Sequence, residues 1–207
     1  MRVTLSIMAI CFAVLVVQAL FPLATVLMAL TPVLAFGGMY WQFFTYMFAH
    51  ASISHFGFNM LGLFIFGITV ERFLGTKRYI LLYILSGAGS GLFHILVTTL
   101  SAGSLSDIPM LGASGAVFAV LTAYAIKFPE AKVMIFPIIV PVKAVYAIAG
   151  FVLFSIFAGF TDIMSGVAHF GHLGGILFGA IFMLYWRWKD SKSGKGAEDF
   201  EWVWDTY

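Results

Sequence analysis

Charge is what this sequence has least of. Only 10% of its 207 residues are charged, whereas 62% are hydrophobic, and soluble domains carry charges at roughly 25% of their positions. The composition therefore excludes an ordinary soluble domain and predicts an integral membrane protein. The formal net charge of +2 is too small to predict a nucleic-acid partner.

Motifs that bind metal ions are also missing from the sequence. Cys11, the one cysteine, lies in an apolar run, which excludes a disulfide framework and a cysteine-based metal site. His169 and His172 form a His-x-x-His pair without the glutamate of a zinc protease. Asp107 and Asp162 lie outside the apolar runs, which argues against an intramembrane aspartate pair. We therefore predict no metal and no other cofactor.

Long apolar runs are abundant, and a membrane-spanning helix needs about 20 mostly apolar residues. Six runs qualify or nearly do: residues 4–29, 55–74, 79–100, 113–128, 137–159 and 169–188. They predict an all-α bundle of six transmembrane helices over residues 1–188, followed by a flexible polar tail over 189–207. Pro137 and Pro141 lie near the start of the fifth run, where a helix tolerates proline best.

The first run has two interpretations. Arg2, the apolar stretch and Val-Gln-Ala at 17–19 resemble a cleavable signal peptide. The apolar run continues past Ala19 to about Leu30, which favours a retained first helix. Cleavage stays open as the alternative.

The basic residues predict the orientation of the helices. All eleven lie in four clusters, whereas the connections 30–54, 101–112 and 160–168 contain none. By the positive-inside rule the clusters are cytoplasmic, and both termini are expected there too. The outer connection 30–54 is long, aromatic and uncharged, so we expect it to lie partly in the outer leaflet.

Four polar residues are predicted to share one depth in the membrane. Ser114, His172, Asn59 and His55 lie about 20 to 25 Å from the nearest cytoplasmic charge on their own helices, at about 1.5 Å per residue. Polar groups at membrane depth are costly and mark functional sites. His94 lies near the same layer, and we interpret it as structural.

The spacing of small residues indicates which helices meet. Gly171, Gly175 and Gly179 recur every four residues, and the run 113–128 is rich in small residues that include Gly115. Such faces allow close approach between helices, which would bring Ser114 and His172 within reach of each other. His55 and Asn59, four residues apart, share one helix face.

Taken singly, each of these residues has a structural interpretation: serine and glycine pack helices, and asparagine bonds helix to helix. Together they favour chemistry, because a serine hydroxyl becomes a nucleophile when histidine removes its proton. No acidic residue lies near His172 in the sequence, so we expect a dyad rather than a triad.

Four motifs resemble those of the rhomboid family of intramembrane serine proteases, over about residues 40–188. They are HASISHFGFN at 50–59, ERFLG at 71–75, GASG at 112–115 and HFGHLGGILFG at 169–179. The resemblance implies a serine endopeptidase that cleaves transmembrane segments of membrane proteins within the lipid bilayer. A bacterial inner membrane is the expected location.

The resemblance also implies a role for each residue. Ser114 would be the nucleophile and His172 its general base and acid. The oxyanion would be held by His55, Asn59 and the backbone N–H of Ser114. The remaining implied roles are helix packing by Gly115, Gly175 and Gly179, and stacking of Phe118 on His172.

One departure and two alternatives accompany this interpretation. Many relatives carry Trp-Arg in the outer connection, where this chain has Trp41-Gln42, so fixing of that loop by an arginine is in doubt. A catalytically inactive rhomboid-like membrane-binding protein is the main alternative function. A channel or transporter is a third, and it would show solute flux without covalent labelling.

Overall fold

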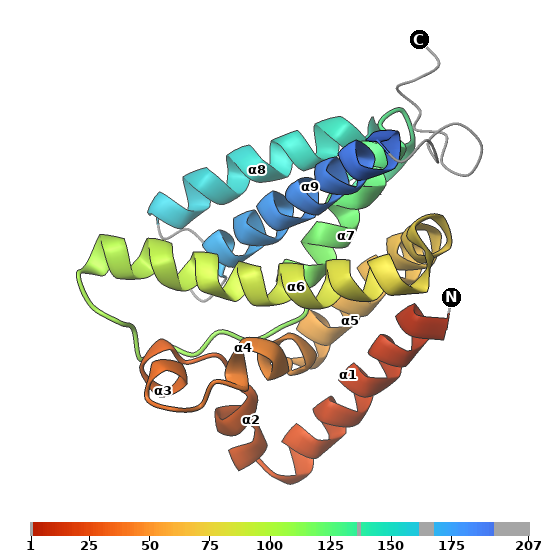
Figure 1. The fold of residues 1–207 in the computed structure, drawn as a ribbon. Coiled ribbons are helices and arrows are strands. Elements are labelled where there is room, and N and C mark those ends of the chain that lie inside the picture. The colour runs from red at the N-terminus through yellow and green to blue at the C-terminus, as the bar shows by residue number, and fades with distance from the viewer. Residues whose placement is uncertain (1, 136–137, 162–167, 193–207) are drawn as a thin grey trace.

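The apolar runs fold into helices that pack as a bundle in the computed structural model, which describes residues 2–135, 138–161 and 168–192 (Figure 1). The helices and turns up to residue 102 are α1 (Arg2–Leu20), α2 (Leu23–Met28), α3 (Pro32–Phe36), α4 (Gln42–Thr45), the 3-10 turn η1 (Tyr46–Phe48), α5 (Ile53–Gly62), the π-turn η2 (Leu63–Gly67) and α6 (Ile68–Ala102). They are followed by α7 (Ser114–Lys127), β1 (Lys132–Ile135), β2 (Ile138–Lys143), α8 (Ala144–Thr161) and α9 (His169–Lys192).

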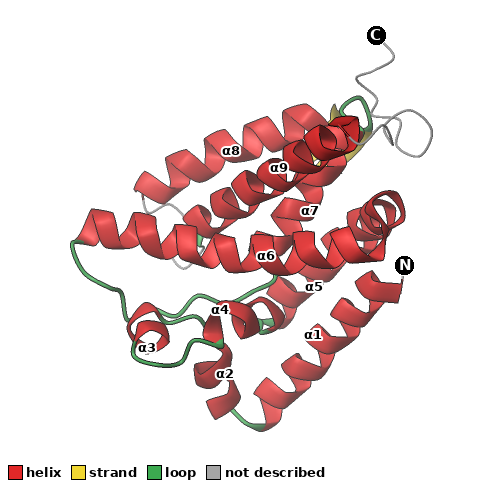
Figure 2. Ribbon diagram, viewed as in Figure 1, coloured by secondary structure: helices red, strands yellow, loops and turns green. Residues whose placement is uncertain are grey.

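Helix α6 runs through the middle of this arrangement. Figure 1 shows α8 and α9 on one side of α6, and α1 to α4 on the other. Helices make up most of the described chain, and the two strands form one short hairpin at the end of the bundle (Figure 2). By length and composition, the helical stretches Arg2–Leu20, Ile53–Ala102 and His169–Lys192 could each span a membrane, whereas α7 and α8 are shorter apolar helices.

The predicted first helix is too long. Helix α1 ends at Leu20, and a separate short helix begins at Leu23. Pro22 lies between them; it lacks a backbone N–H and disfavours the helical conformation at Phe21, so the apolar run continues where the helix cannot.

The predicted second and third helices are separated by a bend rather than by a loop. Gly75 has φ 74° and ψ 162°, a left-handed value that L side chains rarely adopt. Helical backbone continues on both sides of it. The chain therefore changes direction at Gly75, between the first residues of α6 and the rest of that helix.

The predicted start of the fifth helix is wrong. Residues Ile138–Lys143 form strand β2, which pairs antiparallel with β1, and α8 begins only at Ala144. Pro141 cannot donate a helical hydrogen bond, and the β-branched residues around it favour an extended chain. Pro137 lies outside the described residues.

The last helix is longer than predicted. Helix α9 continues to Lys192, so residues 189–192 are helical rather than part of a flexible tail. Arg78 on α6 forms two hydrogen bonds of 2.7 and 2.6 Å with the carboxylate of Asp190, which holds this last turn against α6. The rest of the predicted tail, 193–207, lies outside the described residues.

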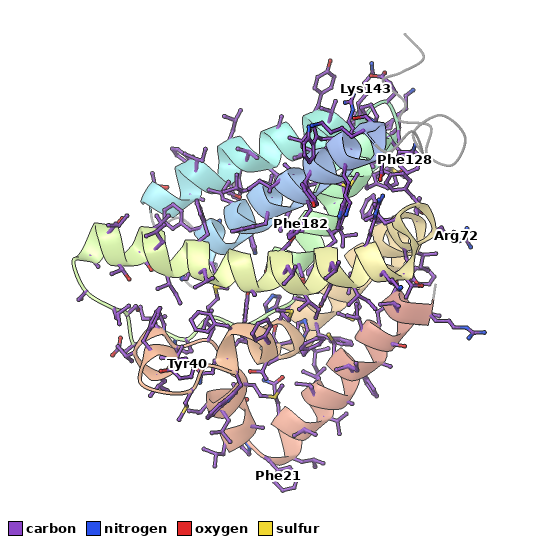
Figure 3. The ribbon with its side chains drawn as sticks, in the orientation of Figure 1. Phe21, Tyr40, Arg72, Phe128, Lys143 and Phe182 are labelled. Carbon is purple, nitrogen blue, oxygen red and sulfur yellow. The ribbon has the colours of Figure 1, made fainter. Side chains whose placement is uncertain are left out.

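Basic side chains gather at one end of the bundle. Arg72 and Lys143 lie at the end where α1 begins and α9 finishes, whereas Tyr40 in the outer connection lies away from it (Figures 1 and 3). Tyr40 and Trp41 are 63% and 50% exposed. An aromatic, uncharged surface is therefore separated from a basic one along the length of the bundle.

Glu71 joins the first helix to the central one. Its carboxylate is buried and accepts the backbone N–H of Val3 (3.1 Å), the backbone N–H of Thr4 (2.9 Å) and the Thr4 hydroxyl (2.7 Å). The first N–H groups of a helix have no partner within it and favour a negative charge. Glu71 therefore caps α1 from α6.

We expect Glu71→Gln to lower the free energy of unfolding in detergent by about 2 kcal/mol, because an uncharged amide replaces a charged acceptor of three hydrogen bonds. Thr4→Val removes only the hydroxyl bond and should cost less. Denaturation followed by circular dichroism measures both effects. Equal stability of Glu71→Gln and the wild type would mean that apolar packing alone holds α1.

Candidate active site

A tight turn places Ser114 as the first residue of α7. Gly112 precedes it with φ 127°, and a Cβ there would lie 2.5 Å from Cε1 of His55. The N–H of Gly112 donates to the carbonyl of Tyr46 (3.0 Å). The position therefore requires a glycine both for its backbone conformation and because the His55 ring fills the space beside it.

Helices α7 and α9 touch through their backbones. A Cβ on Gly175 would collide with the carbonyl of Gly115, and one on Gly179 would lie 2.8 Å from Cα of Ala119. The spacing of small residues predicts this contact, and the structure shows it on the same glycines. Neither helix can carry a larger side chain at these points without moving away from the other.

This contact brings Ser114 and His172 together. The Ser114 Oγ lies 2.8 Å from the Nε2 of His172. Within the described ranges, the Nδ1 of His172 has no hydrogen-bond partner. The hydroxyl can donate to Nε2 when that nitrogen is unprotonated, and no described acid orients the ring from its other side.

Aromatic rings hold the imidazole instead. The ring of Phe118, one turn after Ser114, lies 4.7 Å from the ring of His172 between centroids. Phe151 of α8 stacks on Phe118 at 4.1 Å and lies 5.9 Å from His172. Phe118 was expected from the family resemblance, whereas nothing in the sequence marks Phe151 among the other aromatic residues of α8.

His55 and Asn59 lie on α5 at the edge of the same site. Ser52 caps this helix by accepting the N–H of His55 (3.1 Å). The side-chain amide of Asn59 donates to the carbonyl of His55 (3.0 Å), so one of its N–H groups is bonded within its own helix. An asparagine amide carries two N–H groups, so this bond leaves a second N–H available for a ligand.

One cavity of about 1160 Å³ lies between α5, α6, α7, α8 and α9. Its lining includes Ser114, His172, His55 and Asn59. His94 on α6 also lines it, and its Nδ1 is buried without a partner in the described part of the chain. The shared depth predicted for the four residues therefore corresponds to one shared space. His94 was interpreted as structural, and the structure places it in the lining of this cavity.

Ser90 is a residue that the sequence reasoning did not single out. Its buried hydroxyl on α6 donates to the carbonyl of Gly171 (2.5 Å), next to His172. It also lies against Gly115, next to Ser114. The small-residue run Ser-Gly-Ala-Gly-Ser-Gly at 86–91 was the available signal that α6 joins this helix contact.

Residues 37–189 match the rhomboid domain family. The chain belongs to the rhomboid family. It is 33% identical over 138 residues to Rhomboid protein 1, mitochondrial, of Saccharomyces cerevisiae, covering 67% of this chain and 39% of the yeast protein. It is 30% identical over 162 residues to Rhomboid protease AarA of Providencia stuartii, covering 73% and 57% of the two chains.

A further relative is Presenilin-associated rhomboid-like protein A, mitochondrial, of Danio rerio, which is 36% identical over 140 residues, covering 67% of this rhomboid and 35% of that protein. The matched region thus spans between about a third and three fifths of the length of these relatives. The relatives come from bacteria and from mitochondria, and they include proteins named as proteases and proteins named as rhomboid-like.

We expect Gly175→Ala to abolish any activity of this site, because its methyl group would separate α9 from α7 and with them His172 from Ser114. Gly150→Ala on α8 is the matched control, since a Cβ there meets nothing within 4 Å. Labelling of Ser114 by a fluorophosphonate and thermal stability in detergent are the two measurements. Normal labelling of Gly175→Ala would mean that the helices can separate without disturbing the pair.

Proposed function

We propose that this rhomboid is an intramembrane serine endopeptidase that cleaves transmembrane segments of other membrane proteins. The observation that carries the proposal is the 2.8 Å contact between Ser114 Oγ and His172 Nε2, inside a cavity among apolar helices. A nucleophile and a base within hydrogen-bond reach are the minimum machinery for acyl transfer.

In the first step, Ser114 Oγ attacks the carbonyl carbon of the scissile peptide while His172 Nε2 takes the hydroxyl proton. The tetrahedral intermediate collapses, the C–N bond breaks, and His172 returns that proton to the leaving amine. Water then attacks the acyl-enzyme carbonyl while His172 takes one of the water's protons; the ester C–O bond breaks, His172 returns this proton to Ser114 Oγ, and the new carboxyl group of the product leaves.

The negative charge of the intermediate falls beside donors that the site already holds. The backbone N–H of Ser114 belongs to the first turn of α7, where N–H groups lack partners within the helix. His55 and Asn59 line the same cavity and add side-chain donors. Asn59 would use its second N–H, or release its bond to the His55 carbonyl.

Among the residues that the structure describes, no acid completes the proposed dyad as a third member. The unpartnered Nδ1 of His172 supports this proposal, together with the rings of Phe118 and Phe151 against the imidazole. Packing against these rings would orient the base in place of a carboxylate.

We further propose six transmembrane segments with both termini in the cytoplasm. The gathering of basic residues where α1 begins and α9 ends supports this orientation (Figure 3). The substrates would be transmembrane proteins that reach the cavity from the bilayer. A bacterial inner membrane stays the expected location.

Fluorophosphonate should label the wild type covalently, and Ser114→Ala should abolish the labelling because the nucleophile is missing. His172→Ala should reduce labelling and substrate turnover to background while the fold persists. Ser104→Ala, at an exposed serine, is the control and should label normally. Equal labelling of Ser114→Ala would place the nucleophile elsewhere, and an unlabelled, well-folded wild type would favour the inactive rhomboid-like alternative.

Asn59→Ala should lower kcat by about 10- to 100-fold and leave KM nearly unchanged, because oxyanion donors act only in the transition state. His55→Ala should behave in the same way. Steady-state kinetics and melting temperature in detergent separate this from a packing role. Reduced stability with a normal kcat for the folded fraction would make both residues structural.

The orientation is tested by single cysteines placed in a Cys11→Ala background. In intact cells, a membrane-impermeant maleimide should label Ser104→Cys and leave Lys77→Cys unlabelled until the cells are opened. The opposite pattern would reverse the proposed orientation.

A further inference from the structure

The loop that leads to Ser114 is held by a distant segment of the chain. Leu30 and Met110 exchange two backbone hydrogen bonds, of 2.8 and 2.9 Å, as an isolated antiparallel bridge. Gly112 adds a third bond to the carbonyl of Tyr46 (3.0 Å). The outer connection between α2 and η1 therefore supports the backbone two to four residues before Ser114.

That supporting segment is itself held by side chains of α4 and its flank. Trp41 Nε1 donates to the carbonyl of Leu27 (2.9 Å), and Thr45 Oγ1 donates to that of Met28 (2.9 Å). These carbonyls belong to the last turn of α2, where they lack partners within the helix. The short helix α4 thus caps the end of α2.

Gln42 makes hydrogen bonds both to the last turn of α2 and to the chain after it. Its side chain is fully buried; Nε2 donates to the carbonyl of Val26 (3.1 Å), and Oε1 accepts the N–H of Thr31 (3.1 Å). One side-chain amide therefore forms hydrogen bonds with the backbone on both sides of Leu30. An arginine could replace the donor but could not accept the Thr31 N–H, because a guanidinium has no acceptor.

Few contacts separate the segment held by Gln42 from Ser114 and His55. Leu30 is completely buried, and a Cβ on Gly91 of α6 would lie 2.5 Å from its side chain, so Leu30 is seated against the central helix. Met110 follows through the bridge, and Gly112 is wedged against the His55 ring. A shift of Leu30 would move the turn that aims Ser114 at His172.

We propose that Gln42 is a positioning residue for the nucleophile: it keeps Leu30 paired with Met110 and thereby sets the turn before Ser114. This inference rests on the proposed serine protease function. Gln42 does not touch the reacting groups, and it acts through the Leu30–Met110 bridge.

The first test is Gln42→Met, which keeps the approximate size of the side chain and removes its amide group. In folded protein we expect kcat, and the rate of Ser114 labelling by fluorophosphonate, to fall about 10- to 100-fold with KM little changed, because misplacing a reacting group costs rate rather than binding. Thr45→Val is the matched control. It removes one bond to the same turn of α2 but not the Thr31 contact, and its rates should stay within about twofold of the wild type.

The second test restores the bridge covalently. Hydrogen-bonded antiparallel partners have Cα atoms about 5.5 Å apart, within the range of a disulfide. Leu30→Cys with Met110→Cys, in a Cys11→Ala background that carries Gln42→Met, should label faster when oxidised than when reduced. This comparison is made on one protein, and the melting temperature of both forms shows that a difference in labelling arises in folded protein. If Gln42→Met prevents folding, the conservative Gln42→Glu, which keeps the acceptor and removes the donor, replaces it in both tests.

The outcomes separate the two levels of the proposal. A folded Gln42→Met protein with wild-type rates would overturn the positioning role, and so would equal labelling of the oxidised and reduced cysteine pair. Failure of the wild type itself to label at Ser114 would instead overturn the proposed function.

Discussion

The site depends on one physical constraint, the close backbone approach of α7 and α9 at Gly175 and Gly179. Gly115 meets Gly175, and Ala119 meets Gly179, with no space left for a further carbon atom. In a bilayer the hydrophobic effect does not press helices together, so such close van der Waals contact is what holds them. Because α7 begins at Ser114 and α9 begins three residues before His172, this contact also sets the distance between Ser114 Oγ and His172 Nε2.

The features that depend on helical periodicity could be predicted from the sequence. Glycines every four residues lie on one face, so the spacing of Gly175 and Gly179 is enough to indicate the partner helix of Ser114. Charges at helix ends predict one depth for His55, Asn59 and Ser114, and all three line one cavity. The rhomboid family follows from motifs whose residues are close in sequence, and the family match confirms it.

The features that sequence reasoning missed depend on chain breaks and long-range contacts. Hydropathy does not distinguish a strand from a helix over a short apolar run, so strand β2, which ends at Lys143, was predicted as the start of a helix. The predicted first helix, 4–29, included Pro22, although α1 ends just before this proline. Phe151 contacts the site only because α8 packs there, and no spacing along the chain encodes that contact. For Ser90 a signal existed in the small-residue run at 86–91, and the sequence reasoning did not use it.

Gln42 has a consequence for how the chain enters its membrane. In the proposed orientation, the connection 30–54 must be moved across the bilayer while the protein is being made, and it contains no charged residue. An arginine at this position would put a basic residue on the side of the membrane that the positive-inside rule leaves without one, and would weaken the charge asymmetry that sets the orientation. A neutral amide that both donates and accepts gives the loop its internal bonds and leaves that asymmetry intact.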